Sequence, residues 1–395
     1  GSGSEGGYST CGTSADSYPA TGTDQSAVLA DGTTKELTNA TVTSDSETSS
    51  QDNSSFYGLN AAVLAKNGGK ITMTCVSVTT TGGGANGVFA TGSGSSISLS
   101  KVKISCTGEG GHGVDATVAG TLTLQDVDIT TSGSHGAAIA TDRGGGTITA
   151  TGGTVVTSGV DSPGIYSTGT IAVYGATITA TGAEAAVIEG ENSITLTDTA
   201  LSAAKGTRDR GLMIYQSMSG DAEGNKGTFT MTGGSFAWTS STGPAFFVTN
   251  TTATIVLKGV SISNSSDVLL KAGSDQWGTS GTNGGTVTLV ADGQTLVGNV
   301  VLDAISSLTA TFRNSSAFTG AIDTAGTAKE VAITLDDAST WTVTADSVVT
   351  NLTDASSSFA NIASNGHSVC YKGSVNGQST GSYALPGGGT LEHCN

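Results

Sequence analysis

The chain has 395 residues and carries 32 acidic against 15 basic side chains, which gives a formal net charge of −17. A surface of this charge repels nucleic acid and anionic lipid, and no apolar run approaches the length of a membrane span. We therefore expect no nucleic-acid partner and no membrane insertion. Proline is rare (4 residues), as expected where nearly every backbone N–H joins a strand ladder.

The first 57 residues are expected to form an N-terminal arm and a capping coil. Residues 1–24 show no regular pattern and predict an irregular arm, whereas residues 26–42 predict a first partial coil. The polar stretch 43–55 predicts a loop.

From residue 58 onward, a phrase of alternating apolar and hydroxyl residues returns at regular intervals. Successive copies are 26, 25, 26, 23 and 23 residues apart, counted from Ile71 through Ile97, Leu122, Ile148, Ile171 and Ile194. A fixed period of roughly 20–50 residues indicates a solenoid, in which each repeat packs only on its neighbours. The enrichment in Thr, Val and Ile favours half-buried strands.

Each repeat contains three short extended pieces separated by Gly-rich turns. In the Ile71 phrase, alternation places Ile71 and Met73 inside and Thr72 and Thr74 outside. We therefore predict an all-β fold, a right-handed parallel β-helix of about 12 coils of roughly 21–26 residues, with three strands per coil. It is expected to span residues 58–345, and residues 346–395 are expected to form C-terminal coils and a disulfide-closed cap.

Five cysteines lie far apart, and none belongs to a Cys-x-x-Cys pair, so we expect no zinc, no other metal and no cofactor. Cys370 and Cys394 flank a short terminal segment and are predicted to form a disulfide. Cys11 is expected to join the N-terminal arm to either Cys75 or Cys106, which leaves one thiol over. This cysteine usage favours an oxidising compartment and hence a secreted or cell-surface protein.

The stacked phrases between Ile71 and Trp341 resemble the right-handed β-helices of the pectin-lyase-like superfamily. More narrowly, they look like secreted or cell-surface, adhesin-like β-helix proteins, and the segments 211–222 and 277–281 look like phrases specific to such a family. The resemblance implies a fold and says little about activity, because this fold hosts lyases, hydrolases and inert surface proteins.

Two sets of residues are candidates for chemistry. Gly111-His112-Gly113, followed by Asp115, resembles a phrase of polygalacturonases, but the Asn-Thr-Asp and Arg-Ile-Lys phrases of that family are missing. Segment 205–226 lengthens one coil, and insertions in solenoids become flank loops that often carry function. Its acids, like those of the Asp142-Arg143 pair, alternate with arginines, which favours ion pairs. A carbohydrate-active enzyme with a site near this insert would use residues from both sets, namely His112, Asp115, Asp209 and Asp221.

Other residues are candidates for binding. The last positions of the first extended pieces form a largely apolar ladder, namely Leu64, Phe89, Asp115, Ala140, Tyr166, Ile188 and Ile214. If the ladder is exposed it marks a binding or self-association surface; alternatively it packs under a loop or faces inward. The residues that we select as binding candidates are Phe89, Tyr166, Arg208, Arg210, Tyr215 and Trp277. Outward Thr-x-Thr columns are similar to those of ice-binding solenoids, although they equally suit any solvated strand.

The sequence as a whole favours a non-enzymatic extracellular or cell-surface protein with a structural or adhesive role. Its expected partners are polysaccharides, cell-surface glycans or further copies of the same chain. The alternatives are a polysaccharide lyase or hydrolase, and an ice-binding protein.

Overall fold

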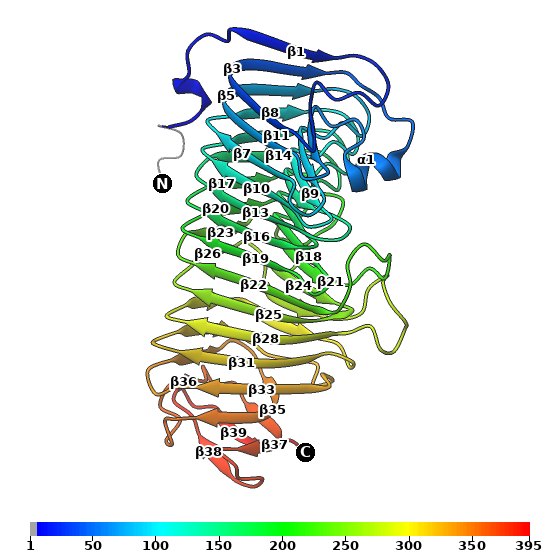
Figure 1. The fold of residues 1–395 in the computed structure, drawn as a ribbon. Coiled ribbons are helices and arrows are strands. Elements are labelled where there is room, and N and C mark those ends of the chain that lie inside the picture. The colour runs from blue at the N-terminus through cyan, green and yellow to red at the C-terminus, as the bar shows by residue number, and fades with distance from the viewer. Residues whose placement is uncertain (1–5) are drawn as a thin grey trace. The chain divides into compact units, whose positions relative to one another are not determined.

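The computed structural model describes residues 6–395 and shows a parallel β-solenoid with 51% strand, 3% helix and about 15 turns (Figure 1). The predicted parallel β-helix is therefore confirmed. The number of turns slightly exceeds the predicted number of about 12, because segments near both ends also form paired strands. No helix among the described residues is long and apolar enough to cross a membrane.

The chain divides into two compact units, which we describe separately. Unit 1 comprises Gly1–Gly211 with Ser219–Glu223, and unit 2 comprises Leu212–Met218 with Gly224–Asn395.

Each coil of unit 1 contributes one strand to each of three faces. Face 1 consists of β2 (Val28–Asp31), β4 (Val63–Lys66), β6 (Val88–Thr91), β9 (Val114–Thr117), β12 (Ile139–Thr141), β15 (Ile165–Ser167) and β18 (Ala186–Glu189). Face 2 consists of β7 (Ser96–Ser100), β10 (Gly120–Gln125), β13 (Gly146–Thr151), β16 (Thr170–Tyr174) and β19 (Ser193–Thr197). Face 3 consists of β1 (Asp16–Ala20), β8 (Lys103–Cys106), β11 (Asp128–Thr131), β14 (Thr154–Thr157), β17 (Thr177–Ala180) and β20 (Ala200–Ala203). The long strands β3 (Thr34–Ser44) and β5 (Lys70–Thr80) run through faces 2 and 3.

The core of unit 1 is a stack of aliphatic side chains in register. In β5, Ile71 and Met73 are buried while Lys70 and Thr72 are exposed, which confirms the predicted alternation. Each of the apolar residues that defined the repeat pairs with its counterpart in the next coil, in the series Ile71, Ile97, Leu122, Ile148, Ile171 and Ile194. Full burial of one such side chain contributes about 1.5–3 kcal/mol, so the stack is the main source of stability.

Between face 2 and face 3 the chain turns at a residue with left-handed backbone conformation, and these residues stack in a column from coil to coil. Asn39, Cys75, Lys101 and Asp126 occupy this corner in successive coils with φ between 52° and 56°. Asn and Asp tolerate this conformation better than most residues, and glycine adopts it freely in the following coil at Gly152.

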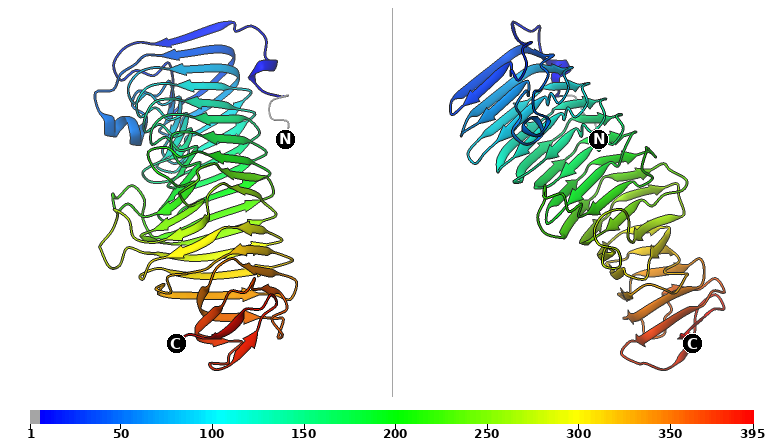
Figure 2. Two further views of the ribbon diagram at one scale, coloured as in Figure 1. Left: turned by 180° about the vertical axis from the view of Figure 1, so that it is seen from behind. Right: turned by 90° about the vertical axis from the view of Figure 1, so that its right-hand side faces the viewer.

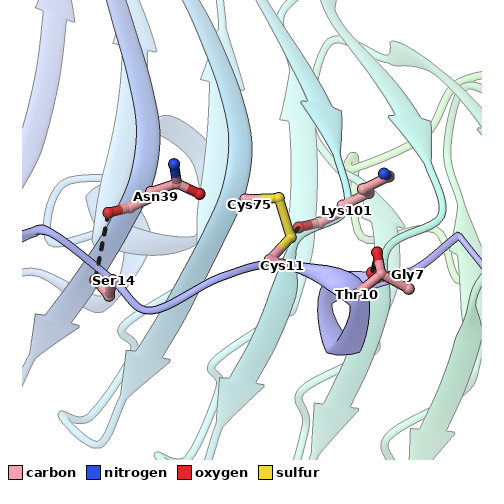
Figure 3. The surroundings of a disulfide bond; sticks show 7 residues. All are labelled: Gly7, Thr10, Cys11, Ser14, Asn39, Cys75 and Lys101. Carbon is pink, nitrogen blue, oxygen red and sulfur yellow. Dashed lines mark hydrogen bonds between the residues drawn. A yellow bond between two sulfur atoms is a disulfide. The ribbon is translucent and has the colours of Figure 1, made fainter.

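The N-terminal arm follows this corner column (Figure 3). The backbone N–H of Ala15 donates to the Asn39 carbonyl, and Cys11 forms a disulfide with Cys75 in the next coil. Cys106 is the thiol left over, and it is buried. The expectation of an irregular arm over residues 1–24 is partly wrong, because β1 pairs in parallel with β3; residues 1–5 lie outside the described part of the chain. The arm also contains the short helix η1 (Tyr8–Thr10).

The prediction of a loop over residues 43–55 is partly wrong, because its last residues belong to the helix α1 (Gln51–Tyr57). Ser50 caps its first turn by accepting a hydrogen bond from the Asn53 N–H, and Gly58 ends it in the left-handed conformation. In the ribbon views, α1 lies beside the first coils of face 1 (Figures 1 and 2). No apolar periodicity marks this helix in the sequence, because Ser54 is its only buried residue.

Unit 2 repeats the same plan with longer strands. One face consists of β21 (Leu212–Tyr215), β24 (Phe246–Thr249), β27 (Val268–Ala272) and β30 (Asn299–Leu302). The second consists of β22 (Lys226–Thr232), β25 (Thr251–Lys258), β28 (Gly285–Asp292), β31 (Ser307–Arg313), β33 (Glu330–Leu335), β35 (Ser347–Asp354), β37 (Val369–Val375) and β39 (Thr390–His393). The remaining strands are β23 (Ser235–Trp238), β26 (Ser261–Asn264), β29 (Thr295–Val297), β32 (Ala317–Gly320), β34 (Thr340–Val343), β36 (Ile362–Ala363) and β38 (Ser382–Ala384).

Aromatic side chains fill the last coils of unit 2. The rings of Phe312 and Phe318 are stacked with centroids 5.4 Å apart, and Trp341 follows at 6.2 Å from Phe318. At the C-terminal end β37 and β39 pair in parallel, β38 turns back antiparallel to β39, and the predicted disulfide joins Cys370 to Cys394. These contacts cover a strand edge that would otherwise be open for pairing with another chain.

Candidate functional site

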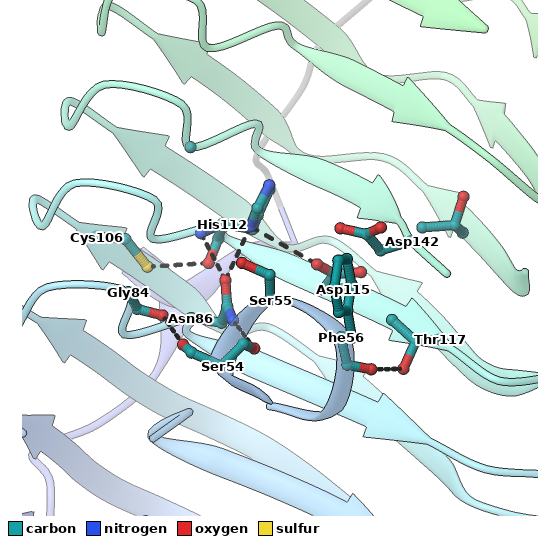
Figure 4. Close-up of polar contacts among 12 residues, drawn as sticks. Ser54, Ser55, Phe56, Gly84, Asn86, Cys106, His112, Asp115, Thr117 and Asp142 are labelled. Carbon is teal, nitrogen blue, oxygen red and sulfur yellow. Dashed lines mark hydrogen bonds and ion pairs between the residues drawn. The ribbon is translucent and has the colours of Figure 1, made fainter. Parts of the chain in front are cut away.

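The outer side of face 1 gathers ionisable side chains from several coils of unit 1 (Figure 4). Asp115 lies on β9, Asp142 directly follows β12, and Glu189 ends β18. The tip of the insert adds Asp221, which forms an ion pair with Arg143 over 2.7 Å. We call these residues, together with His112, the carboxyl cluster.

Strand register explains why residues so far apart in sequence meet here. Asp115 pairs with Phe89 on one side and with Ala140 on the other, and Ala140 pairs with Tyr166. Residues paired in a parallel ladder project to the same side of the sheet, so the ladder predicted from the sequence exists. The prediction of Ile188 as a member of this ladder is wrong, because Tyr166 pairs with Val187.

Helix α1 covers the first part of this ladder. Leu64 and Phe89 are buried and pack with Ala61, close to the end of the helix at Gly58. Thr117 Oγ1 donates a 2.6 Å hydrogen bond to the carbonyl of Phe56, and the Arg143 guanidinium lies 3.9 Å from the Phe56 ring centroid. The ladder is therefore not the exposed apolar surface that we considered, and the alternative that it packs beneath another segment applies here.

Asn86 connects α1 to His112. Its amide nitrogen donates to the carbonyl of Ser54 in the helix, and its amide oxygen accepts from the backbone N–H of His112. The same oxygen lies 2.9 Å from His112 Nδ1, which fixes the ring tautomer with the proton on Nδ1. Burial lowers the pKa of His112 to about 4, so the ring is neutral at pH 7.

Asp115 is fully buried, and neither of its carboxyl oxygens has a hydrogen-bond partner among the described residues. His112 Nδ1 lies 3.6 Å from one of these oxygens, too far for a hydrogen bond. Burial, with a smaller contribution from the neighbouring Asp142 carboxylate, raises the pKa of Asp115 well above its ordinary value. Burial therefore favours the protonated form of Asp115 more strongly than that of an exposed aspartate.

Asp142 is the titrating group of the cluster. Its pKa is raised to about 7, mainly by burial and to a smaller extent by the carboxylates of Asp221 and Glu189, while the hydrogen bond from the Arg143 backbone N–H and the Arg143 charge oppose the rise. The cluster is open to solvent on this side, since Asp142 is only half-buried and the Asp221 side chain is 31% exposed. At its base the Tyr166 hydroxyl donates a 2.7 Å hydrogen bond to the buried Glu189.

The structure thus brings together three of the four residues selected for an enzyme, namely His112, Asp115 and Asp221. The fourth, Asp209, forms an ion pair with Lys205 over 3.8 Å within the insert. Among the described residues no group of three or more His, Cys, Asp or Glu side chains is placed to hold a metal ion.

The residues selected for binding differ in burial and in the contacts they make. Phe89 is completely buried, so its selection as a surface platform is wrong: its ring supports the end of α1. Arg210 is also buried and lies 3.6 Å from Glu184, whereas Arg208 is half-buried. In unit 2, the rings of Tyr215 and Trp277 pack on each other at 4.7 Å, with Tyr215 only 7% exposed.

Sequence reasoning missed Glu189, Asn86 and Phe56 as parts of this site. Glu189 could have been found, because it ends the same extended piece as Val187, just as Asp142 follows Ala140. Asn86 and Phe56 carry no such signal, because their roles depend on where α1 docks.

No protein-family model matches the chain, and no curated protein matches it. The site must therefore be interpreted from its own geometry.

Proposed function

We propose that the chain is an extracellular carbohydrate-active enzyme that hydrolyses glycosidic bonds at the carboxyl cluster. The observation that carries this proposal is the position of Asp142, a half-buried carboxyl with a pKa raised to about 7 beside the Asp221 carboxylate. Glycosidases use a pair of carboxyl groups in which one is protonated near working pH and the other is ionised. The two disulfides of the structure support an extracellular location.

In this proposal Asp142 donates its proton to the glycosidic oxygen as the bond from that oxygen to the anomeric carbon breaks. The Asp221 carboxylate, oriented by Arg143, takes a proton from a water molecule whose oxygen bonds to the anomeric carbon. One water is consumed and two shorter sugar chains leave. The proton gained by Asp221 returns to Asp142 through solvent. The Asp115 and Glu189 side chains act as positioning groups behind the acid.

The neighbouring coils argue against a purely structural role for the Asp115 carboxyl. The same ladder holds Leu64, Phe89, Ala140 and Val187 in other coils, so the fold is satisfied by apolar side chains at this position. A buried polar group without hydrogen bonds costs about 1–3 kcal/mol, and Asp115 carries that cost. Such a cost is typical of sites where function opposes stability.

The test is the release of reducing ends from a panel of polysaccharides between pH 5 and 8. Asp142→Asn should lower turnover by about 10²–10⁴-fold, the usual contribution of a general acid. Asp337→Asn, an exposed acid of unit 2, is the matched control and should leave turnover unchanged. Equal activity of the two variants would refute the role of Asp142, and no turnover of any polysaccharide would refute the enzyme.

A second candidate function is a structural or adhesive surface protein, comparable to the adhesin-like β-helix proteins that the chain resembles. It is supported by the outer side of face 2, where Thr121, Thr147, Thr170 and Ser193 pair in register. Regularly spaced hydroxyls of this kind suit a repetitive surface such as a packed polysaccharide or ice. The adjacent column is interrupted by Ala172. Sedimentation with insoluble polysaccharides and a thermal-hysteresis measurement test this candidate, and no effect in either would remove it.

A further inference from the structure

A groove lies on the outer side of face 1, beside α1 and the first coils. It is an open groove with a volume of about 600 Å³ between the strands β2 and β4 and the exposed side of α1. Its lining includes Leu29 on β2, Asn53 and Tyr57 on α1, and Lys66 with Asn67 at the end of β4. All of these residues belong to unit 1.

The groove combines apolar surface with accessible polar groups. Tyr57 is 48% exposed and Leu29 is 41% exposed, and both side chains line the groove. The Tyr57 hydroxyl and the Asn53 amide belong to exposed residues of α1, and half-buried Lys66 ends β4. An aromatic ring beside accessible amide and hydroxyl groups matches the two sides of a sugar, its apolar ring face and its hydroxyl rim.

The charge of the groove favours a neutral ligand. Its lining contains one acid, Asp24, and one base, Lys66. Hydrogen bonds from the Ser49 side chain and backbone lower the pKa of Asp24, so its carboxylate is ionised and already satisfied. With a formal charge of −17 on the whole chain, a polyanionic ligand would be repelled.

We propose that this groove is a binding site for a neutral oligosaccharide chain, with Tyr57 as its stacking platform. The site lies outside the carboxyl cluster and holds a glycan without cleaving it. It would serve either candidate function, because it requires no turnover.

The experiment is calorimetric titration of the full chain. The chain is produced in a bacterial host so that Asn53, which begins the glycosylation sequon Asn53-Ser54-Ser55, carries no glycan. The probes are the hexasaccharides of cellulose, xylan, mannan, laminarin and chitin, with hexagalacturonate as a charged comparison. Asp142→Asn protein is titrated in parallel, so that loss of hydrolysis and loss of groove binding are measured separately. At least one neutral hexasaccharide should bind to both proteins with equal affinity.

Tyr57→Ala should weaken that binding about tenfold, equivalent to about 1.4 kcal/mol of lost stacking. Tyr57→Phe keeps the ring and should weaken it by less than about threefold. Tyr174→Ala is the matched control, because Tyr174 is 42% exposed on face 2 and should leave binding unchanged. Leu29→Ser tests the same groove from β2, without altering α1, and should weaken binding severalfold.

Three results would overturn the proposal. They are no binding of any neutral hexasaccharide, tighter binding of hexagalacturonate, and an equal loss of affinity in Tyr57→Ala and Tyr174→Ala. Failure of hydrolysis with normal binding would leave the groove standing and refute the enzyme alone.

Discussion

Two stretches of one ladder on the outer side of face 1 have opposite character. In the coils of β4 and β6 the ladder holds Leu64 and Phe89, which are buried against the end of α1. One coil further on it holds Asp115, buried equally well but without a hydrogen bond. Both stretches have the same parallel strand pairing. The comparison therefore distinguishes side chains that the fold needs for stability from a side chain, Asp115, that it does not need. The apolar stretch stabilises the protein. The acidic stretch lowers its stability and places ionisable side chains at the candidate site.

The largest effect on stability is expected in the apolar stretch. Phe89→Ala should destabilise unit 1 by about 3–5 kcal/mol, because it opens a cavity beneath Gly58 where the Phe89 ring now packs. Denaturant unfolding followed by circular dichroism measures this loss, and amide exchange should show that α1 opens more readily. An effect below about 1 kcal/mol would mean that α1 does not depend on this contact.

The acidic stretch should respond in the opposite direction. Asp115→Leu, which restores the residue type of the neighbouring coils, should raise the free energy of unfolding by about 1–3 kcal/mol. The same substitution should abolish turnover, because the positioning carboxyl behind Asp142 is lost. A destabilised Asp115→Leu protein would contradict the view that this carboxyl opposes stability.

The pH dependence of the free energy of unfolding tests the shifted pKa values of Asp142 and His112. The folded-state pKa of Asp142 is raised to about 7, so its contribution to stability is fully present below its unfolded pKa of about 4. It is lost as pH rises through about 7. His112 acts in the opposite sense, because its folded pKa is lowered to about 4 and protonation destabilises the fold as pH falls below about 6.5.

The contribution of Asp142 is isolated by subtracting the Asp142→Asn curve from the wild-type curve. The free energy of unfolding of the wild type should fall relative to the variant between about pH 4 and pH 7. The measurement is urea unfolding at closely spaced pH values. A flat difference over that range would show that Asp142 has an ordinary pKa.

The smallest effect is expected at the link between the two stretches. Thr117→Val removes the 2.6 Å hydrogen bond to the Phe56 carbonyl and should cost about 0.5–1.5 kcal/mol. Amide exchange in α1 detects it, with Thr121→Val on the solvent side of face 2 as the matched control. Similar protection factors in both variants would show that the bond does not hold the helix.

Much of the fold was predictable because a solenoid repeats one simple pattern. The alternation around Ile71 set which side chains face inward, and the spacing of the phrases set the register of face 2. The pairing of Cys370 with Cys394 followed from their closeness in sequence, and the disulfide between them is confirmed. The sequence alone could not decide whether Cys11 pairs with Cys75 or with Cys106. The N-terminal arm lies along the corner between faces 2 and 3, and this corner brings Cys75 next to Cys11 only once the coils are stacked.

The site was less predictable, for two physical reasons. A one-residue shift within an apolar piece is invisible to sequence patterns, and so Ile188 was placed in the ladder where Val187 belongs. The docking of α1 depends on long-range hydrogen bonds, such as that from Asn86 to Ser54, which leave no periodic signal. The sequence offers His112 and Asp115 in one phrase and Asp221 in the insert, and only the stacked coils bring the two segments into one cluster.

The most direct test of the carboxyl cluster is a nuclear magnetic resonance titration of ¹³C-labelled aspartate carboxyls. One resonance should titrate near pH 7 in the wild type and be absent from Asp142→Asn. If every aspartate that titrates in the wild type does so below about pH 5, close to the unperturbed value, Asp142 is an ordinary surface acid and the account is wrong.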